Sequence, residues 1–373
     1  GLLYDIVRHP LLQRLTRIKQ VGLSSVVYPG AQHTRFQHSL GAFHLMSEAI
    51  TQLASKGNFI FDSEAEAVQA AILLHDIGHG PFSHVLEDTI VKGVSHEEIS
   101  LMLMERMNKE MNGQLSLAIQ IFKDEYPKRF LHQLVSGQLD MDRLDYLRRD
   151  SFYTGVTEGN IGSARIIKML DVADDRLVVE SKGIYSIENF LTARRLMYWQ
   201  VYLHKTSVAY EKMLISTLLR AKELASQEVE LFASPALRFF LYNDINPTEF
   251  YNNPDCLENF IQLDDNDIWT ALKVWSTHTD KVLSTLSTGM INRNIFKVEI
   301  SSEPISEDRK KELTLHISQQ LGITLSEANY FVSTPSIEKN MYEPADDSID
   351  IIYKDGTIKN IAEASDMLNI SLL

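Results

Sequence analysis

The stretch Leu73-Leu74-His75-Asp76-Ile77-Gly78-His79-Gly80-Pro81-Phe82-Ser83-His84 decides how the rest of the chain is interpreted. It places three histidines and an aspartate within ten residues, directly after an apolar helical pattern. Gly78, Gly80 and Pro81 would end that helix at the same point. Such a concentration of imidazole and carboxylate groups rarely arises from packing alone. We therefore take it as the first candidate for a metal or catalytic site.

The composition around this stretch is that of an ordinary globular protein. The chain has 373 residues, 44% hydrophobic and 23% charged, which is enough for a large core in one or two domains. A net charge of −14 argues against extended nucleic-acid binding, although a local group of arginines and lysines could still hold phosphates. No apolar run is long enough for a membrane span, and no signal peptide opens the chain. The single cysteine, Cys256, fits a reducing compartment, so we expect a cytoplasmic protein without a membrane partner.

Working outward, the spacing of apolar residues predicts a mainly helical chain. The pattern that precedes the histidines predicts a central buried helix from Ser63, as its N-cap, to Ile77. Before it we expect a helix over 2–21, broken near His9-Pro10, and a second helix that ends near Leu53. Further helices are predicted at about 95–111, 114–123, 127–136, 140–149, 160–170, 186–226, 229–241 and 265–286.

Strands are expected in two places. Residues 177–185 have the pattern of a small β-hairpin that turns at Lys182-Gly183. Near residue 290 the pattern changes again, and short alternating stretches mix with helical ones. The sequence therefore predicts a mainly α fold, with a helical domain over 1–290 and a small appended C-terminal α+β subdomain over 291–373. In that subdomain we expect strands at 295–300, 329–333 and 348–353 and helices at 306–321 and 360–367.

A divalent metal bound through nitrogen and oxygen needs imidazoles and carboxylates that converge from several elements. His75 and Asp76 are adjacent at a helix end, where neighbouring side chains can turn to one point. An isolated pair of this kind would more simply be a helix C-cap with a solvated aspartate. The pair is not isolated, because seven of the twelve histidines lie between His33 and His96.

The run from His75 to His84, with His38 upstream and Asp142 downstream, resembles the HD-domain metal-dependent phosphohydrolases. The dNTP triphosphohydrolases of that superfamily have segments similar to residues 18–22, 28–31, 33–41 and 140–150. The similarity is to the branch of the animal SAM-and-HD-domain dNTPase and its bacterial relatives. The resemblance implies an HD-domain helical bundle. It also implies one divalent transition metal, Fe, Mn, Zn or Ni, with Mg²⁺ as an ion that could join through substrate phosphates. The implied metal ligands are His38, His75, Asp76 and Asp142.

Catalytic roles follow from the same resemblance. It implies that His84 and His96 approach the α-phosphate, and that Glu87 or Glu97 aligns a histidine. Histidine has the pKa range to donate a proton near neutrality. Which of the two histidines is the acid stays open, and the alternative for His96 is a surface histidine at a helix start. Glu87 stands where the animal relative has an aspartate.

Substrate recognition is implied in more detail. Arg35 could hold phosphate oxygens, and its alternative is a structural ion pair. Tyr146 and Tyr202 would pack on the sugar so that a 2′-hydroxyl does not fit, while Tyr198 replaces a histidine of the animal relative and leaves base preference open. The residues expected at the substrate are Gln20, Arg35, His79, Arg143, Tyr146, Asp150, Tyr202 and Lys205.

We therefore expect a hydrolase that converts deoxynucleoside triphosphates into deoxynucleoside and inorganic triphosphate. One alternative is an HD-type phosphodiesterase or nucleotidase acting on another phosphate ester, and another is a largely non-catalytic nucleotide sensor. The resemblance implies a homo-oligomer, either a dimer or a tetramer, with a nucleotide activator at a subunit interface. Residues Arg8, Gln13 and Thr16 align with the animal activator site, and two of the three differ, so the same activator is not expected.

Overall fold

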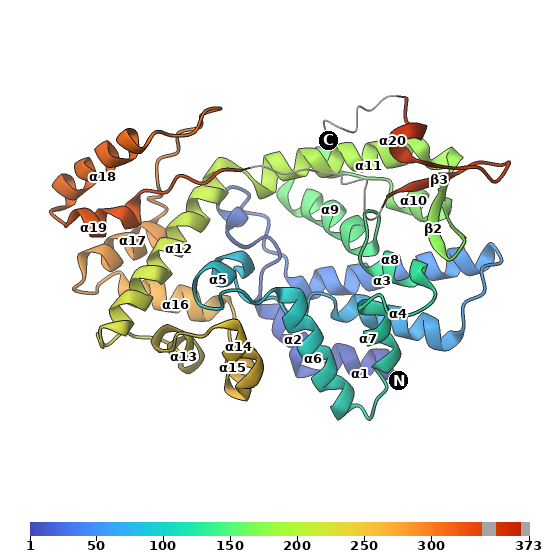
Figure 1. Cartoon of the computed structure of the whole chain (residues 1–373), viewed down its shortest axis with the longest axis horizontal. Coiled ribbons are helices and arrows are strands. Elements are labelled where there is room, and N and C mark those ends of the chain that lie inside the picture. The colour runs from blue at the N-terminus through green and yellow to red at the C-terminus, as the bar shows by residue number, and fades with distance from the viewer. Residues whose placement is uncertain (338–347, 367–373) are drawn as a thin grey trace.

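Helices build almost all of the molecule, and one small four-stranded sheet lies at one end of its long axis (Figure 1). The computed structural model describes residues 1–337 and 348–366. Among these residues, every helix is too short or too polar to span a lipid bilayer. The mainly α fold predicted from the sequence is confirmed.

Three helices form the centre of the molecule. α3 (Arg35–Ser55) packs against both α4 (Asp62–Leu74) and α9 (Met141–Thr154). α4 is apolar on almost every side and is buried along most of its length, as expected for a central helix. Because α4 ends beside α3 and α9, the residues that follow it come close to both helices.

The start of α4 differs from the prediction. The backbone N–H of Phe61 donates to Glu64 Oε2 at 2.9 Å, so Phe61 is the N-cap and Ser63 lies in the first turn. Glu64 is fixed there because Tyr126 and Lys128 both donate to its carboxylate. The helix also ends at Leu74 rather than Ile77, which leaves His75 at its C-cap.

The N-terminal segment breaks where proline predicts it. α1 (Leu2–Arg8) and α2 (Pro10–Gln13) meet at His9, and a 3₁₀ turn, η1 (Arg14–Arg17), follows. The predicted helix is wrong beyond η1, because Lys19 forms a β-bridge with Thr34 and the Gln20 N–H donates to the carbonyl of His33. Segment 18–20 is therefore extended, and it lies beside the start of α3.

Most of the remaining predicted helices are present. The range 186–226 is divided by a π-helical turn, the range 265–286 is broken at 276–280, and the helix predicted at 229–241 begins only at Pro235. The short helices at 83–89, 247–252 and 254–260 were not predicted. The other elements of the helical part are η2 (Gly22–Val26), α5 (Ser83–Thr89), α6 (His96–Glu110), α7 (Ser116–Phe122), α8 (Arg129–Val135), η3 (Thr157–Gly159), α10 (Ser163–Met169), α11 (Ile184–Met197), η5 (Tyr198–Tyr202), α12 (Lys205–Ser226), α13 (Pro235–Tyr242), α14 (Pro247–Asn252), α15 (Pro254–Phe260), α16 (Asp265–Trp275) and α17 (Lys281–Asn292).

The hairpin predicted over 177–185 is wrong, because only its first half is a strand and the helix α11 begins at Ile184. A different hairpin precedes it. β1 (Leu170–Ala173) pairs antiparallel with β2 (Arg176–Glu180), and the chain turns at Asp174-Asp175. Both aspartates have positive φ, 51° and 60°, as the tightest hairpin turns require. Lys182-Gly183 lies instead in a 3₁₀ turn, η4 (Ser181–Gly183).

The C-terminal segment joins this sheet. β3 (Asp350–Ile352) pairs in parallel with β2, and β4 (Ile358–Asn360) pairs antiparallel with β3, in the order β1-β2-β3-β4. The strand predicted at 348–353 is therefore confirmed. The short helix α20 (Ile361–Ala364) lies within the predicted 360–367, whose last residue is outside the described part of the chain.

Two other predicted strands are wrong. Residues 295–300 have no regular structure and are mostly exposed, and no strand in the described part of the chain pairs with them. Residues 329–331 form a 3₁₀ turn, η6 (Asn329–Phe331), after α19 (Leu325–Ala328). The predicted helix at 306–321 is confirmed as α18 (Glu307–Leu321), at the end of the molecule opposite the sheet (Figure 1). The division into domains at residue 290 stays a prediction.

Candidate metal centre and substrate site

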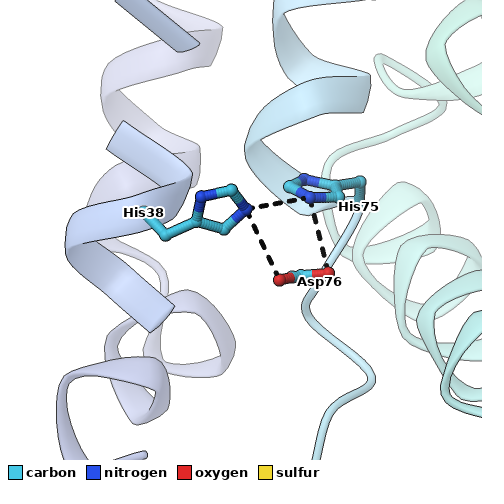
Figure 2. A group of neighbouring side chains, drawn as sticks. All are labelled: His38, His75 and Asp76. Carbon is cyan, nitrogen blue, oxygen red and sulfur yellow. Dashed lines mark hydrogen bonds and ion pairs between the residues drawn. The ribbon is translucent and has the colours of Figure 1, made fainter. Parts of the chain in front are cut away.

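Three side chains converge where α3 meets the end of α4 (Figure 2). His38 Nε2 lies 3.3 Å from His75 Nε2 and 3.7 Å from Asp76 Oδ2. His75 Nε2 lies 3.4 Å from Asp76 Oδ1. One ligand atom from each of the three residues lies within 4.8 Å of the others, so the group can hold a metal ion.

Asp142 reaches the same point from the first turn of α9. Its Oδ1 lies 3.0 Å from His38 Nε2 and 3.3 Å from His75 Nε2. The structure therefore brings together all four residues predicted as ligands, from three different elements. That they bind a metal stays a prediction.

Hydrogen bonds orient both imidazoles. His38 Nδ1 lies 2.7 Å from Asp145 Oδ2, and His75 Nδ1 lies 2.6 Å from the carbonyl oxygen of Ile72. Neither oxygen can donate a proton, so each Nδ1 carries the hydrogen and each Nε2 can present its lone pair. Arg149 in turn donates to both oxygens of Asp145. Two oriented imidazoles beside two carboxylates are a donor set that suits a divalent transition metal.

The charges in this group reinforce that interpretation. Burial lowers the pKa of His75, but Asp76 and Asp142 outweigh burial and raise it to about 9. Burial raises the pKa of Asp142, but His75 and His38 hold it well below its ordinary value. A divalent cation would replace only the protons on Nε2, because a ligating imidazole must be neutral and each Nδ1 keeps its hydrogen.

Arg35 forms the ion pair that was its alternative interpretation. Its Nη1 donates to Asp76 Oδ2 at 3.1 Å. Its Nε is buried and has no hydrogen-bond partner among the described residues. Arg35 thus stands at the edge of the metal group, and one of its donors is still unsatisfied.

A second group lies beside the first. The rings of His79 and His96 stack with centroids 3.9 Å apart. Glu87 lies between two histidines, with Oε1 3.3 Å from His96 Nδ1 and Oε2 3.5 Å from His84 Nδ1. Glu97 is more distant, 3.8 Å from His96 Nε2, and its side chain is 71% exposed. Glu87 is therefore better placed than Glu97 to align a histidine.

The electrostatics distinguish these histidines. The hydrogen bond between His84 and Glu87 raises the pKa of His84, although burial opposes the shift. Burial raises the pKa of Glu87, but the hydrogen bonds with His84 and His96 outweigh it and hold that pKa far below its ordinary value. Burial and the nearby Arg35 lower the pKa of His79 to about 3. His79 is thus neutral, whereas His84 favours the protonated form.

A polar and aromatic group lies further along α9. Asp150 accepts hydrogen bonds from the Tyr202 hydroxyl and from His33 Nε2, both at 2.6 Å. The rings of Tyr146 and Tyr202 meet edge to face, 6.0 Å apart. Gln20, on the extended segment before α3, has a buried Oε1 without a hydrogen-bond partner among the described residues.

The two remaining predicted substrate residues point to other partners or to solvent. Arg143 donates to the carbonyl of Gly137 and to Asp140, the N-cap of its own helix. Lys205 is exposed at the first residue of α12. The structure does not bring either one into contact with the metal group, so their roles stay predictions.

Comparison with known proteins now identifies the family. A model of the HD domain matches residues 35–150, and a model of the HD associated region matches residues 161–244. The chain is 95% identical to a phosphohydrolase from Bacteroides thetaiotaomicron VPI-5482, whose crystal structure it matches with a TM-score of 0.98, over 100% of this chain and 93% of that one. This chain is an HD-domain phosphohydrolase.

More distant relatives of this HD phosphohydrolase differ in how much is known of them. An uncharacterized protein of Bacillus subtilis, YwfO, is 29% identical over 98% of this chain and 84% of its own length. The Dictyostelium discoideum homolog of the deoxynucleoside triphosphate triphosphohydrolase SAMHD1 is 30% identical over 79% of this chain and 56% of its own length. The chain spans about half the length of the SAMHD1 relatives that it matches, 46% for the human protein.

The HD match contains the whole metal group. The sequence did not single out two further residues, Asp145 beside the metal group and Arg194 near Arg143 and Tyr146. Asp145 follows Asp142 by three residues, so both lie on one face of α9, and that spacing could have revealed it. Arg194 gave no such signal, because it stands beside Arg195 in a helix, where arginines are usually solvated. It is 7% exposed in α11, and burial and the charge of Arg143 lower its pKa.

Proposed function

We propose that this HD phosphohydrolase hydrolyses deoxynucleoside triphosphates to deoxynucleoside and inorganic triphosphate. The supporting observation is one face of α9, which carries Asp142, Tyr146 and Asp150 at intervals of four residues. Along the helix axis, Asp142 and Asp150 are about 12 Å apart, eight residues at 1.5 Å each. A nucleotide with its phosphates at the metal group would have its sugar beside Tyr146 and Asp150.

His38, His75, Asp76 and Asp142 would hold one divalent metal, Fe, Mn, Zn or Ni. When bound, this ion supplies charge neutralisation at the phosphates and lowers the pKa of an attacking water. Arg35 carries an unsatisfied buried donor beside that position, which suits a phosphate oxygen.

The proposed reaction needs a proton donor for the leaving 5′ oxygen. Water attacks the α-phosphorus, the bond from phosphorus to O5′ breaks, and O5′ takes up a proton. We assign the role of proton donor to His96, because its ring is partly buried, stacks on the ring of His79 and pairs with Glu87. His84 is the alternative, and its side chain is 79% exposed.

We propose that the rings of Tyr146 and Tyr202 discriminate against ribonucleotides. Tyr146 and Tyr202 pack edge to face, and the Tyr202 hydroxyl is engaged by Asp150. Because the Tyr202 hydroxyl is already engaged, discrimination would depend on the two rings leaving no room for a 2′-hydroxyl or for the water that solvates it.

The test is a panel of deoxynucleoside triphosphates with Mn²⁺ or Mg²⁺ and identification of the products. We expect inorganic triphosphate and deoxynucleoside, and we expect Asp142→Ala to abolish both metal retention and turnover. Asp308→Ala, on the exposed start of α18, is the matched control and should keep full activity. Release of only monophosphate or pyrophosphate would instead favour a phosphodiesterase or nucleotidase, and nucleotide binding without product would favour a sensor.

We also propose that the chain works as a homo-oligomer, a dimer or tetramer, with a nucleotide activator at a subunit interface. Support comes from the match to SAMHD1 relatives. Light scattering with and without added nucleotide measures the mass directly. A monomer under every condition would contradict this proposal without affecting the proposed chemistry.

A further inference from the structure

Arg14, the first residue of η1, is buried although it carries a charge. Its side chain is 2% exposed, and its Cζ lies 5.5 Å from the centre of the Phe260 ring. Its Nη1 donates to the carbonyl oxygen of Ile77 and its Nη2 to that of His79, both at 2.8 Å. The guanidinium thus bonds to two backbone oxygens that are two residues apart in the loop after α4.

Placing a charge in this position costs folding free energy. Burial lowers the pKa of Arg14 to about 10, so the group is still protonated at neutral pH. A buried cation bonded to neutral carbonyls contributes less stability than a well-packed apolar side chain of similar volume would. Its rigid, forked set of donors, however, fixes the distance and direction between two acceptors.

The loop is also held from its other side. Ser100 Oγ donates to the carbonyl of His75 at 3.0 Å and accepts from the N–H of Gly78 at 2.8 Å. Gly78 allows this approach, because a Cβ there would lie 2.1 Å from the carbonyl oxygen of His96. Side chains from two distant segments, Arg14 and Ser100, therefore hold the backbone of residues 75–79.

We propose that Arg14 is a positioning residue for the metal centre. Asp76 directly precedes Ile77, and His79 Nε2 lies 3.3 Å from Asp76 Oδ1. By fixing the carbonyls on both sides of Gly78, Arg14 holds Asp76 at its distance from the two ligand histidines. The inference rests on the proposed function only in that Asp76 is a proposed ligand.

The effect is measured by titrating the metal-free chain with Mn²⁺ and following free Mn²⁺ by electron paramagnetic resonance. Displaced groups that orient metal ligands typically cost about 10- to 100-fold in affinity, and we expect Arg14→Met to weaken Mn²⁺ binding by that amount. Arg14→Lys should weaken Mn²⁺ binding less than Arg14→Met does, because lysine keeps the positive charge. It should still weaken binding, because an ammonium group lacks the fork of donors that spans two carbonyls.

The matched control is Arg220→Met. Arg220 is also buried, 7% exposed, and it donates to Asp280 at the contact of α12 with α17, away from the loop. This variant should lower the melting temperature and leave Mn²⁺ affinity unchanged.

In a hydrolysis assay, Arg14→Lys should lower kcat more than it raises KM.

Wild-type Mn²⁺ affinity in Arg14→Met, or an equal loss in Arg220→Met, would overturn the proposal. If Arg14→Met does not fold, Arg14→Lys decides the matter, and wild-type affinity in that variant overturns it. The titration contains no nucleotide, so a wrong substrate assignment would leave its result intact.

Discussion

The carboxylate of Glu87 contacts two histidines that differ in exposure, since the side chain of His84 is 79% exposed and that of His96 is 24% exposed. Because the hydrogen bond with Glu87 raises the pKa of His84, this imidazole should still be protonated above the ordinary histidine pKa. The stability that it contributes is fully present below the ordinary histidine value and is lost as pH rises through the raised pKa. For Glu87, whose pKa is lowered, stability is present above the ordinary carboxyl value and is lost as pH falls through the lowered one.

We predict that Glu87→Gln lowers the pKa of His84 toward its ordinary value. The reason is that the amide carries no charge to stabilise the imidazolium. A titration of the imidazole ring signals by nuclear magnetic resonance measures it directly. Glu97→Gln is the control and should leave His84 unchanged; a larger shift in that variant would mean that Glu97 is the aligning carboxylate.

The residues of the metal group could be predicted from the sequence, whereas the hydrogen bonds that position them and their neighbours could not. His75 and Asp76 are adjacent, and the family segments around His38 and Asp142 are recognisable. The hydrogen bond from His33 to Asp150 joins residues 117 positions apart, and no local pattern reports such a pairing. Arg14 was equally invisible, because its partners are backbone carbonyls, which have no sequence signature.

At the scale of the element, the π-helical turn η5 sets the direction of Tyr202. The N–H of Leu203 donates to the carbonyl of Tyr198 at 2.7 Å, five residues back, instead of the usual four. Such a turn holds one more residue than an α-helical turn. The Tyr28 hydroxyl donates to the carbonyl of Gln200 at 2.5 Å and uses a backbone acceptor within the turn.

We predict that deleting Trp199 abolishes the contact of Tyr202 with Asp150. An ordinary helical turn would then rotate Tyr202 by about 100° around the helix axis. Activity on deoxynucleoside triphosphates should fall by about 100-fold, the cost of misplaced binding groups, while far-ultraviolet circular dichroism stays the same. Trp199→Ala keeps the backbone length and removes a side chain that is 48% exposed, so it should keep most of the activity. Full activity in the deletion variant would contradict the role of the turn.

Elements with a strong local signal were predicted well, and those defined by their neighbours were not. Helix α6 starts at His96 because Ser95 and Glu98 form a capping box, a pattern that the sequence displays. The alternating stretch 295–300 has the pattern of a strand, but strands need partners, and no strand within residues 1–337 and 348–366 pairs with it. The hairpin turn was missed because glycine is a stronger turn signal than two aspartates, although Asp174 and Asp175 both adopt positive φ.

At the scale of the whole molecule, the sheet connects the two regions of sequence that were expected to be separate. Ile351 on β3 is fully buried and pairs with Val179 on β2. We predict that Ile351→Ala lowers the free energy of unfolding by about 2–5 kcal/mol, the usual range for such a change in a core. Thermal and denaturant unfolding measure this loss.

Ile358→Ala on β4 is the matched control, because that side chain is 40% exposed. It should change the unfolding free energy far less than Ile351→Ala does. Equal effects of the two substitutions would show that β3 contributes no more than a surface strand. The helical part would then be independent of the sheet's C-terminal half.

The parallel pairing of β2 with β3 also has a consequence in time. Val179 and Ile351 are 172 positions apart in the chain. Ribosomes add about 5–20 residues each second, so β3 is made about 10–30 s after β2. During that interval one edge of β2 has no strand partner, and an open edge can pair with another nascent chain. Translation speed and chaperone supply should therefore affect how much of this protein reaches its native state.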